Sequence, residues 1–368
     1  MSRIRVLIVD DAVVIRRLVG DVLAADPDIE VVGTAANGRI ALQKIPQCNP
    51  DVVTMDVEMP DMNGIETVRE LRKTWTKLPV IMFSTLTERG GVATLDALAA
   101  GASDYATKPA NVGSVTAGLE TVRTDLIPKI KALAGRVVAP PAPPKPVRAA
   151  VPPAAATTPA TGAARPASDI ALVAIGVSTG GPNALAELLP ALPANLPVPI
   201  VITQHMPPMF TRLLADRLDA QSAIEVVEGQ AGMRLKPGTA YIAPGDYHMV
   251  LERVATGTVL ALNQDPPENS CRPAVDVMFR SAVELHHGAV LGVILTGMGQ
   301  DGLRGCELLR DAGGQVIAQD EASSVVWGMP GFVARAGLAD RVLPLNMIAG
   351  DIVRRLTAAS RVTAARAS

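Results

Sequence analysis

A serine set among glycines, Ser178 in GVSTGG (176–181), is the residue whose type and setting first suggest chemistry in this chain. It follows the apolar run ALVAIGV (171–177), which predicts a buried strand that ends in a glycine-rich loop. Such a loop can cradle a phosphate, expose a nucleophile or only turn the chain. The glycines lack the dinucleotide-binding spacing, no P-loop lysine is present, and the next strand ends in a histidine. A phosphate site is therefore disfavoured.

A serine nucleophile needs a base, and the base needs an acid that orients it. His205 follows the expected strand PIVITQ (199–204), and Asp301 lies just after the expected strand AVLGVILTG (289–297). The α/β folds collect functional residues at the carboxyl ends of parallel strands. We therefore expect Ser178, His205 and Asp301 to meet there as nucleophile, base and orienting acid.

The other three histidines have different expected roles. His248 lies in TAYIAPGDYHMVLERV (239–254), a stretch predicted to form a hairpin, and it is the second choice for the base. His286 and His287 end a predicted helix, where a cation is favoured, so capping explains them. The helix that starts near Pro182 would offer free N–H groups to an oxyanion close to the serine.

Five polar residues of the first third of the chain also fall at predicted strand ends. Asp10 and Asp11 end the first strand and Asp56 ends the third, while Ser84 and Lys108 end the fourth and fifth. These side chains should face one crevice. Three carboxylates repel one another there, and Mg²⁺ with waters and a phosphate oxygen would relieve that repulsion. The hydroxyl and the ammonium group are suited to anionic oxygens.

Apolar runs that alternate with helical stretches indicate parallel sheets covered on both faces. In the first half the expected strands are RVLIVDD (5–11), EVVGTA (30–35), DVVTMD (51–56), PVIMFS (79–84) and DYATKP (104–109). In the second half they are ALVAIGV (171–177), PIVITQ (199–204), TAYIAP (239–244), AVLGVILTG (289–297) and GQVIAQD (314–320). The fold class predicted is α/β, with two doubly wound parallel-sheet domains. One is five-stranded, and the other is larger, Rossmann-like and carries a β-hairpin.

A linker separates the two predicted domains. Residues 139–167 contain nine prolines and almost nothing that could be buried, so this Pro/Ala-rich stretch is predicted to be semi-extended. We expect domains at 1–125 and 169–365, with a helix end and the linker at 126–168.

Composition narrows the function classes. Residues 169–368 carry 19 acidic and 15 basic side chains, which does not suit binding to nucleic acid. Three widely spaced cysteines give no zinc or disulfide pattern and suit a reducing compartment. The first apolar run is too short for a signal peptide, and later runs are too short for a membrane span. We expect a cytoplasmic protein without membrane insertion.

The first domain resembles a response-regulator receiver domain across residues 1–125, through VDD (9–11), MDVEMPDMNG (55–64), FST (83–85) and TKP (107–109). The resemblance implies that a histidine kinase phosphorylates Asp56. The residues that it assigns to Mg²⁺ are Asp10, Asp11, Asp56 and, through its backbone carbonyl, Glu58. The residues that it assigns to phosphoryl contact and to the rotameric switch are Ser84, Lys108 and the aromatic Tyr105.

The second domain resembles the catalytic domain of the chemotaxis protein-glutamate methylesterase (CheB) family across residues 169–365. The motifs are GVSTGGP (176–182), TQHMPPMFT (203–211), YIAPGDYH (241–248), SCRPAVDVMFRS (270–281), LTGMGQDG (295–302) and AQDEASSVVWGMP (318–330). The resemblance implies the roles already expected for the serine, histidine and aspartate, and an oxyanion region at Thr179 and Met298. Tyr247 and Gln300 look less standard and bear on substrate fit.

The two resemblances together imply a phosphorylation-regulated esterase. Its substrates would be methylated cytoplasmic domains of chemoreceptors, with glutamine deamidation beside demethylation, and the ester chemistry would need no cofactor. Three rivals stay open: a DNA-binding output domain, a module that binds receptors without chemistry, and an esterase for small molecules. The scarcity of aromatics, 2% of residues, disfavours the deep pocket that the last would use.

Overall fold

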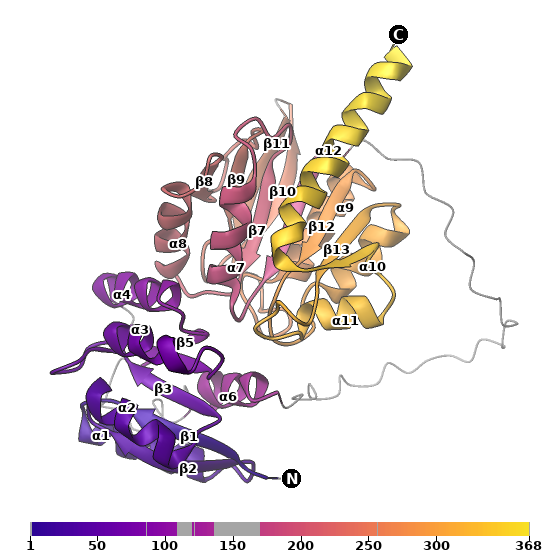
Figure 1. The fold of residues 1–368 in the computed structure, drawn as a ribbon. Coiled ribbons are helices and arrows are strands. Elements are labelled where there is room, and N and C mark those ends of the chain that lie inside the picture. Colours follow the sequence, from indigo (N-terminus) through magenta and orange to yellow (C-terminus); the bar gives the residue numbers. More distant parts are fainter. Residues whose placement is uncertain are drawn as a thin grey trace, which may run out of the picture.

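The computed structural model describes residues 2–85, 87–108, 120, 122–135, 170–255 and 257–367. It contains two α/β units that lie against each other, and the predicted linker at 139–167 is outside the described residues (Figure 1). Within the described part of the chain, no helix has both the length and the apolar character needed to cross a membrane.

The first unit is a parallel sheet with strand order β2-β1-β3-β4-β5. Its strands are β1 (Ile4–Val9), β2 (Ile29–Ala35), β3 (Val52–Asp56), β4 (Val80–Ser84) and β5 (Asp104–Thr107). Its helices are α1 (Val13–Ala24), α2 (Gly38–Cys48), α3 (Gly64–Thr74), α4 (Glu88–Ala99) and α6 (Ile127–Leu133), the last preceded by a π-helical turn (Val122–Leu126). The five strands predicted here are confirmed, with ends that differ by two residues or fewer.

Local sequence explains where these elements start. The Asn63 side chain accepts a hydrogen bond from the Glu66 N–H at 2.9 Å, and the Glu66 carboxylate accepts one from the Asn63 N–H at 3.1 Å. This capping box starts α3 at Gly64. All residues of β3 are buried, as expected for a central parallel strand, and this brings Asp56 to the buried edge of the sheet.

The second unit is a larger parallel sheet with strand order β14-β13-β12-β6-β7-β9-β8. Its strands are β6 (Leu172–Val177), β7 (Ile200–Gln204), β8 (Glu225–Glu228), β9 (Thr239–Ile242), β12 (Val290–Ile294), β13 (Gln315–Gln319) and β14 (Arg341–Leu343). Its helices are α7 (Gly181–Leu188) with a 3₁₀ turn (Leu189–Ala191), α8 (Phe210–Asp219), α9 (Val275–His286), α10 (Leu303–Asp311), α11 (Met329–Arg335) and α12 (Leu345–Ala367). The fold class is therefore confirmed, and β8 and β14 are strands that the sequence patterns did not reveal.

Two apolar layers sandwich this sheet. Helices α7, α8 and α12 pack on one face, against Val173, Ile175 and Val177 of β6. Helices α9, α10 and α11 pack on the other face, against Leu172 and Ala174. Because β6 is buried on both sides, it reads as a continuous apolar run, and the loop after it emerges at the edge of a rigid layer.

The hairpin predicted at 239–254 is wrong in its position. Thr239–Ile242 is β9, fully buried between β7 and β8 in the parallel sheet. The hairpin is formed one strand later by β10 (His248–Val254) and β11 (Gly257–Asn263), which pair antiparallel with His248 opposite Asn263. The residues PGDY (244–247), which resemble a tight hairpin turn, instead connect the sheet to the hairpin.

Candidate active site

Three adjacent strands carry the serine, the histidine and the aspartate. Strand β6 lies between β12 and β7, so later strands of the chain are added on both sides of it. Ser178 follows β6, His205 follows β7, and Asp301 lies in the loop between β12 and α10. The structure thus brings the predicted residues to the carboxyl edge at the topological switch point of the sheet, where α/β proteins place their ligands.

Glycine makes the serine loop possible. Gly180 has φ +77°, a left-handed conformation, and is the N-cap of α7. A Cβ atom on Gly181 would lie 1.8 Å from Oε1 of Gln204, whose Nε2 atom donates to the carbonyl of Ser178 at 3.0 Å. A Cβ atom on Gly297 would lie 2.8 Å from Cβ of Ser178. The loop after β12 can therefore sit directly against the serine.

His205 and Asp301 form a buried pair. Nε2 of His205 lies 2.8 Å from Oδ2 of Asp301, and the side chains are 13% and 3% exposed. The N–H of Val275 also donates to Oδ2 at 2.6 Å. Burial raises the pKa of Asp301, but the imidazole and backbone donors outweigh it and hold this pKa below its usual value. The carboxylate is therefore ionised and fixes a proton on Nε2.

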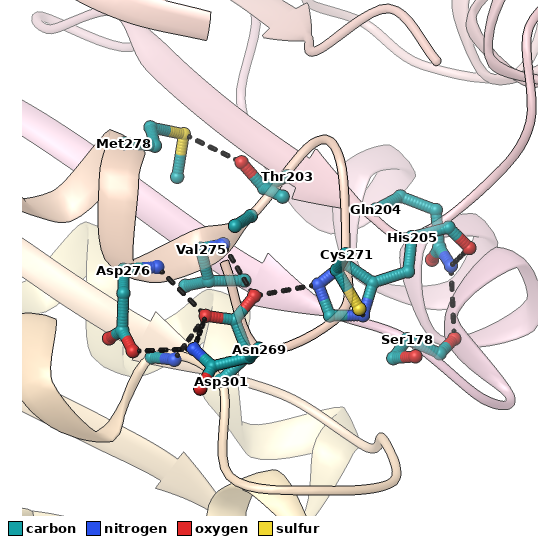
Figure 2. A network of polar contacts seen from close by, with 12 residues as sticks. Ser178, Thr203, Gln204, His205, Asn269, Cys271, Val275, Asp276, Met278 and Asp301 are labelled. Carbon is teal, nitrogen blue, oxygen red and sulfur yellow. Dashed lines mark hydrogen bonds and ion pairs between the residues drawn. The ribbon is translucent and has the colours of Figure 1, made fainter. Parts of the chain in front are cut away.

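The second ring nitrogen of His205 faces the serine side of the site (Figure 2). Its Nδ1 atom lies 3.6 Å from Sγ of Cys271, while Oγ of Ser178 makes no hydrogen bond within the described residues. Burial lowers the pKa of His205, whereas Cys271 and Asp301 raise it, and the net shift is upward. The two contacts that hold the ring are thus also the ones that favour its protonation.

Free backbone donors surround the serine. Thr179 is buried, and Met298 is half-buried in the loop that packs against Ser178. Among the described residues, the N–H groups of Thr179, Gly180 and Met298 have no acceptor. They can therefore donate to an oxygen that gains negative charge.

The remaining histidines are structural. His248 is buried, and its Nδ1 atom accepts from the N–H of Ala274 at 3.2 Å, so it is not an alternative base. Burial and the nearby charges of Arg253 and His287 lower the pKa of His286, which disfavours the cationic cap expected at the end of α9.

The two less standard positions border the hairpin and the aspartate loop. Tyr247 is 39% exposed just before β10, and Gln300 is half-buried next to Asp301. Their effect on substrate fit stays a prediction.

The acidic crevice of the first unit fits a divalent cation. Ligand oxygens of Asp10, Asp11 and Asp56 lie within 4.8 Å of one another. Lys108 places its Nζ atom 2.8 Å from both Asp10 and Asp56. Burial raises the pKa of Asp56 to about 6, although Lys108 lowers it. A hard cation would compensate this repulsion among buried carboxylates.

The other receiver-type residues lie on β4, β5 and the loop after β3. Ser84 is buried at the end of β4, and Tyr105 is buried in β5. Glu58 lines a cavity of about 630 Å³ beside Asp11, and its side chain pairs with Arg89 at 3.2 Å. Its role as a carbonyl ligand stays a prediction.

The first unit covers the serine loop of the second. The buried carboxylate of Asp104 lies close to the side chain of Thr179, which lowers the pKa of Asp104 while burial raises it. Lys129 of α6 lies 3.9 Å from Asp104, donates to the Tyr105 carbonyl at 2.6 Å and interacts electrostatically with Cys271. A carboxylate and an ammonium group of one unit therefore stand beside Thr179 and Cys271, which adjoin the proposed nucleophile and base of the other.

Further contacts between the two units hold the first unit against the second (Figure 1). Asp96 of α4 pairs with Arg217 of α8 at 2.6 Å, and the Asn183 amide donates to the carbonyl of Ala102 at 3.2 Å. An apolar cluster is continuous across both units. Between α4, α7 and α8 lies a cavity of about 280 Å³.

Fold and site define a class: a receiver-type α/β unit joined to a second parallel sheet that carries serine, histidine and aspartate at adjacent strand ends. Comparison with known proteins agrees. The response regulator receiver domain family matches residues 6–120, and the CheB methylesterase family matches residues 173–352. The chain belongs to the CheB family of protein-glutamate methylesterases.

Similar proteins cover nearly the whole chain. A Nocardioides protein is 58% identical over 97% of this chain and 96% of its own length, and a Trichodesmium erythraeum protein is 53% identical over 97% and 100%. Both are named protein-glutamate methylesterase/protein-glutamine glutaminase. The crystal structure of the Thermotoga maritima CheB methylesterase catalytic domain is 44% identical, covers 50% of this chain and 97% of that one, and has a TM-score of 0.49.

Proposed function

We propose that this chain hydrolyses glutamyl γ-methyl esters on the cytoplasmic domains of chemoreceptors and deamidates glutamine side chains by the same acyl chemistry. The observation that supports the proposal is the position of Ser178, His205 and Asp301 after three adjacent strands, with His205 bonded to Asp301. The shared name of the curated relatives, which gives both activities, supports the choice of substrate.

The hydrogen bonds of the imidazole assign the direction of proton transfer. Because Nε2 of His205 is bonded to Asp301, Nδ1 is the atom that accepts the proton of the Ser178 hydroxyl. As Oγ attacks the ester carbonyl, its hydroxyl replaces the Cys271 thiol as the partner of Nδ1. General base catalysis of this kind contributes roughly 10²- to 10⁴-fold in rate.

The carbonyl oxygen becomes an oxyanion when the Oγ–C bond forms. The free N–H groups of Thr179, Gly180 and Met298 are the donors available to it. One such donor contributes roughly 10²- to 10³-fold. The tetrahedral intermediate collapses when the bond to methoxide breaks, and the proton on Nδ1 passes to this leaving group to give methanol.

Water then completes the cycle. His205 takes a proton from water as its oxygen attacks the acyl carbon, and the proton returns to Oγ of Ser178 when the glutamate carboxylate leaves. With a glutamine substrate the first leaving group is ammonia. Every step uses water and groups of this unit, so the proposed hydrolysis has no step that calls for a cofactor.

Product release from a methylated receptor tests the function. We expect the chain, incubated with Mg²⁺ and a small phosphodonor, to release methanol from methylated receptor and ammonia from receptor with glutamines at the same sites. A fluorophosphonate should label Ser178 and block both. Receptor binding without either product would instead support a binding module, and turnover of small esters alone would support a small-molecule esterase.

The position of the first unit supports a regulation in which docking controls the access of a protein substrate to the serine loop. Asp104 and Lys129 stand beside Thr179 and Cys271, where a protein substrate would have to enter. Phosphorylation of Asp56 by a histidine kinase would bias the docked state through its added charge. We expect deletion of residues 1–139 to raise basal methanol release. Equal or lower release by the shortened chain would contradict inhibition by the cover.

The crevice residues support the phosphorylation site itself. Asp10, Asp11 and Asp56 are the carboxylates that would hold Mg²⁺, which when bound neutralises charge on the incoming phosphoryl group. An Asp56 oxygen forms the new bond to phosphorus as the bond to the donor histidine breaks. Lys108, now shared by Asp10 and Asp56, is placed to bind a phosphoryl oxygen, and Ser84 lies at the neighbouring strand end.

A further inference from the structure

A two-residue turn next to α9 lies against the carboxylate of Asp301. The N–H of Glu268 donates to the Cys271 carbonyl at 3.1 Å, and the N–H of Cys271 donates back at 2.9 Å. The residues between them, Asn269 and Ser270, have φ values of +53° and +63°. Two consecutive left-handed residues are the pattern of a type I′ turn, which is uncommon without glycine. Such backbone strain persists where the surroundings require it.

The side chain of Asn269 explains what the turn positions. Its Nδ2 atom donates to Oδ1 of Asp301 at 2.8 Å and to Oδ2 of Asp276 at 2.9 Å (Figure 2). Both amide hydrogens are used, and each goes to the carboxylate of a buried residue. The turn is anchored from outside by Glu268, whose carboxylate pairs with Arg280 of α9 at 2.8 Å.

A neutral donor is needed at this place because the two carboxylates are close. Burial and the charge of Asp301 raise the pKa of Asp276 to about 6, while the Gly305 N–H and Asn269 lower it. Glu268, Arg280 and the buried thiol of Cys306 are the other titratable groups around Asp276. An amide can satisfy both carboxylates without adding charge, which neither a lysine nor an acid could do.

The same turn also reaches the other side of the imidazole. Cys271, its last residue, contacts Nδ1 of His205, while Asn269 holds the carboxylate that bonds Nε2. The orientation of the ring therefore depends on two side chains of one rigid turn. Residues that fix the orientation of a catalytic base act on rate without touching substrate.

We propose that Asn269 is a positioning residue for the hydrolysis: its amide ties Asp301 to Asp276, and so holds the His205 ring with Nδ1 directed toward Ser178. This inference rests on the function proposed above for the same site. It adds a side chain from the 268–271 turn to the serine, histidine and aspartate.

Two substitutions of Asn269 distinguish the role of its side-chain amide from the role of the turn. Asn269→Gly keeps a residue that favours positive φ but removes the donor. We expect kcat to fall by roughly 10- to 100-fold, the range for a hydrogen bond to a charged group, with KM nearly unchanged. Asn269→Asp keeps the size but adds a third carboxylate, and we expect a larger loss.

The pH profile distinguishes a residue that positions His205 from one that only stabilises the fold. The active base is neutral, so the acidic limb of the kcat profile follows the pKa of His205. In Asn269→Gly, Asp301 is held less firmly and the limb should move to lower pH. In Asn269→Asp, the added negative charge should move it to higher pH. Ser270→Gly, whose side chain contacts neither carboxylate nor ring, should leave rate and profile unchanged.

A measurement independent of turnover keeps this proposal separate from the proposed function. In NMR spectra of the full chain recorded above the pKa of His205, the neutral ring should carry its proton on Nε2 in the wild type and in Ser270→Gly. Its titration should differ from the wild type in both Asn269 variants. Wild-type kcat, pH profile and histidine titration in both Asn269 variants would overturn the positioning role. A wild-type chain without methanol release, but with these NMR shifts, would overturn only the proposed function.

Discussion

The ring of Tyr105 stacks on the ring of Phe210, with centroids 5.2 Å apart and planes within 8° of parallel. Tyr105 directly follows Asp104 in β5, and Phe210 begins α8 five residues after His205. The stack therefore joins β5, the strand that also carries Asp104, to the segment of the second unit that carries His205, the proposed base. If Tyr105 is the switch aromatic, its movement would break an interdomain contact as well as a contact within the first unit.

The Asp96–Arg217 pair gives a test of the interface by charge exchange. The pair is partly exposed at 45% and 27%, so each reversal, Arg217→Asp or Asp96→Arg, should weaken docking modestly. We expect basal methanol release to rise by roughly twofold to fivefold in either single variant. In the double exchange, release should return toward the wild-type rate, as coupling in a double-mutant cycle requires. Additive increases would show that the two side chains do not interact in solution.

Loss of the serine hydroxyl tests the proposed nucleophile. Ser178→Ala should lower methanol and ammonia release by at least roughly 10³-fold, because both steps pass through Oγ. The side chain makes no hydrogen bond within the described residues, so the free energy of unfolding should change by less than about 0.5 kcal/mol. Urea unfolding followed by circular dichroism serves as the control. Residual turnover near the wild-type rate would require another nucleophile.

Removal of the Cys271 thiol should change the pH range of activity. Cys271 raises the pKa of His205, so Cys271→Ala lowers it and leaves more neutral imidazole at a given pH. The acidic limb of the kcat profile should then move to lower pH. Cys48→Ala, which removes a thiol on α2 of the other unit, is the matched control. An unchanged limb would mean that the thiol does not interact with the ring in solution.

Stability conferred by the His205 pair has a defined pH window. A histidine with a raised folded pKa stabilises the native state fully below its unfolded pKa, and this contribution disappears as pH rises through the folded value. We therefore expect His205→Gln to destabilise the chain more below pH 6 than at high pH. Chemical denaturation at a series of pH values gives this difference, and a cost independent of pH would contradict it.

Addition of Mg²⁺ tests the acidic crevice. A ligand that binds only the native state at 100 times its Kd stabilises it by about 2.7 kcal/mol. The melting transition of the first unit should therefore rise with Mg²⁺ concentration. Asp11→Asn should abolish the rise and, because Asp11 is exposed, leave the fold intact. Asp21→Asn, an exposed acid on α1, should keep the wild-type response.

Much of the architecture could be predicted because strands and their ends are local features. Val- and Ile-rich runs are typical of buried parallel strands, and Ser178 and His205 are each next to one. Parallel pairing then brings such ends to one edge whatever their separation in the chain. The ring orientation was not predictable, because it depends on which nitrogen meets Asp301 after folding.

The missed features are all non-local or depend on backbone conformation. The hairpin was misplaced because PGDY (244–247) has turn-forming residues but lies between a sheet strand and β10. Asn269 escaped notice because its role depends on positive φ and on two distant carboxylates. No sequence motif marks Asp104 or Lys129, because their interactions with Thr179 and Cys271 form only when the two units dock.

The His205–Asp301 pair of this protein is already formed while the first unit covers the serine loop. His205 and Asp301 are bonded to each other while Asp104 still contacts Thr179, so separation of the two units would not have to rebuild the machinery. The interval between signal and turnover would then be that of a domain opening, on the order of microseconds to milliseconds, with no slower refolding step.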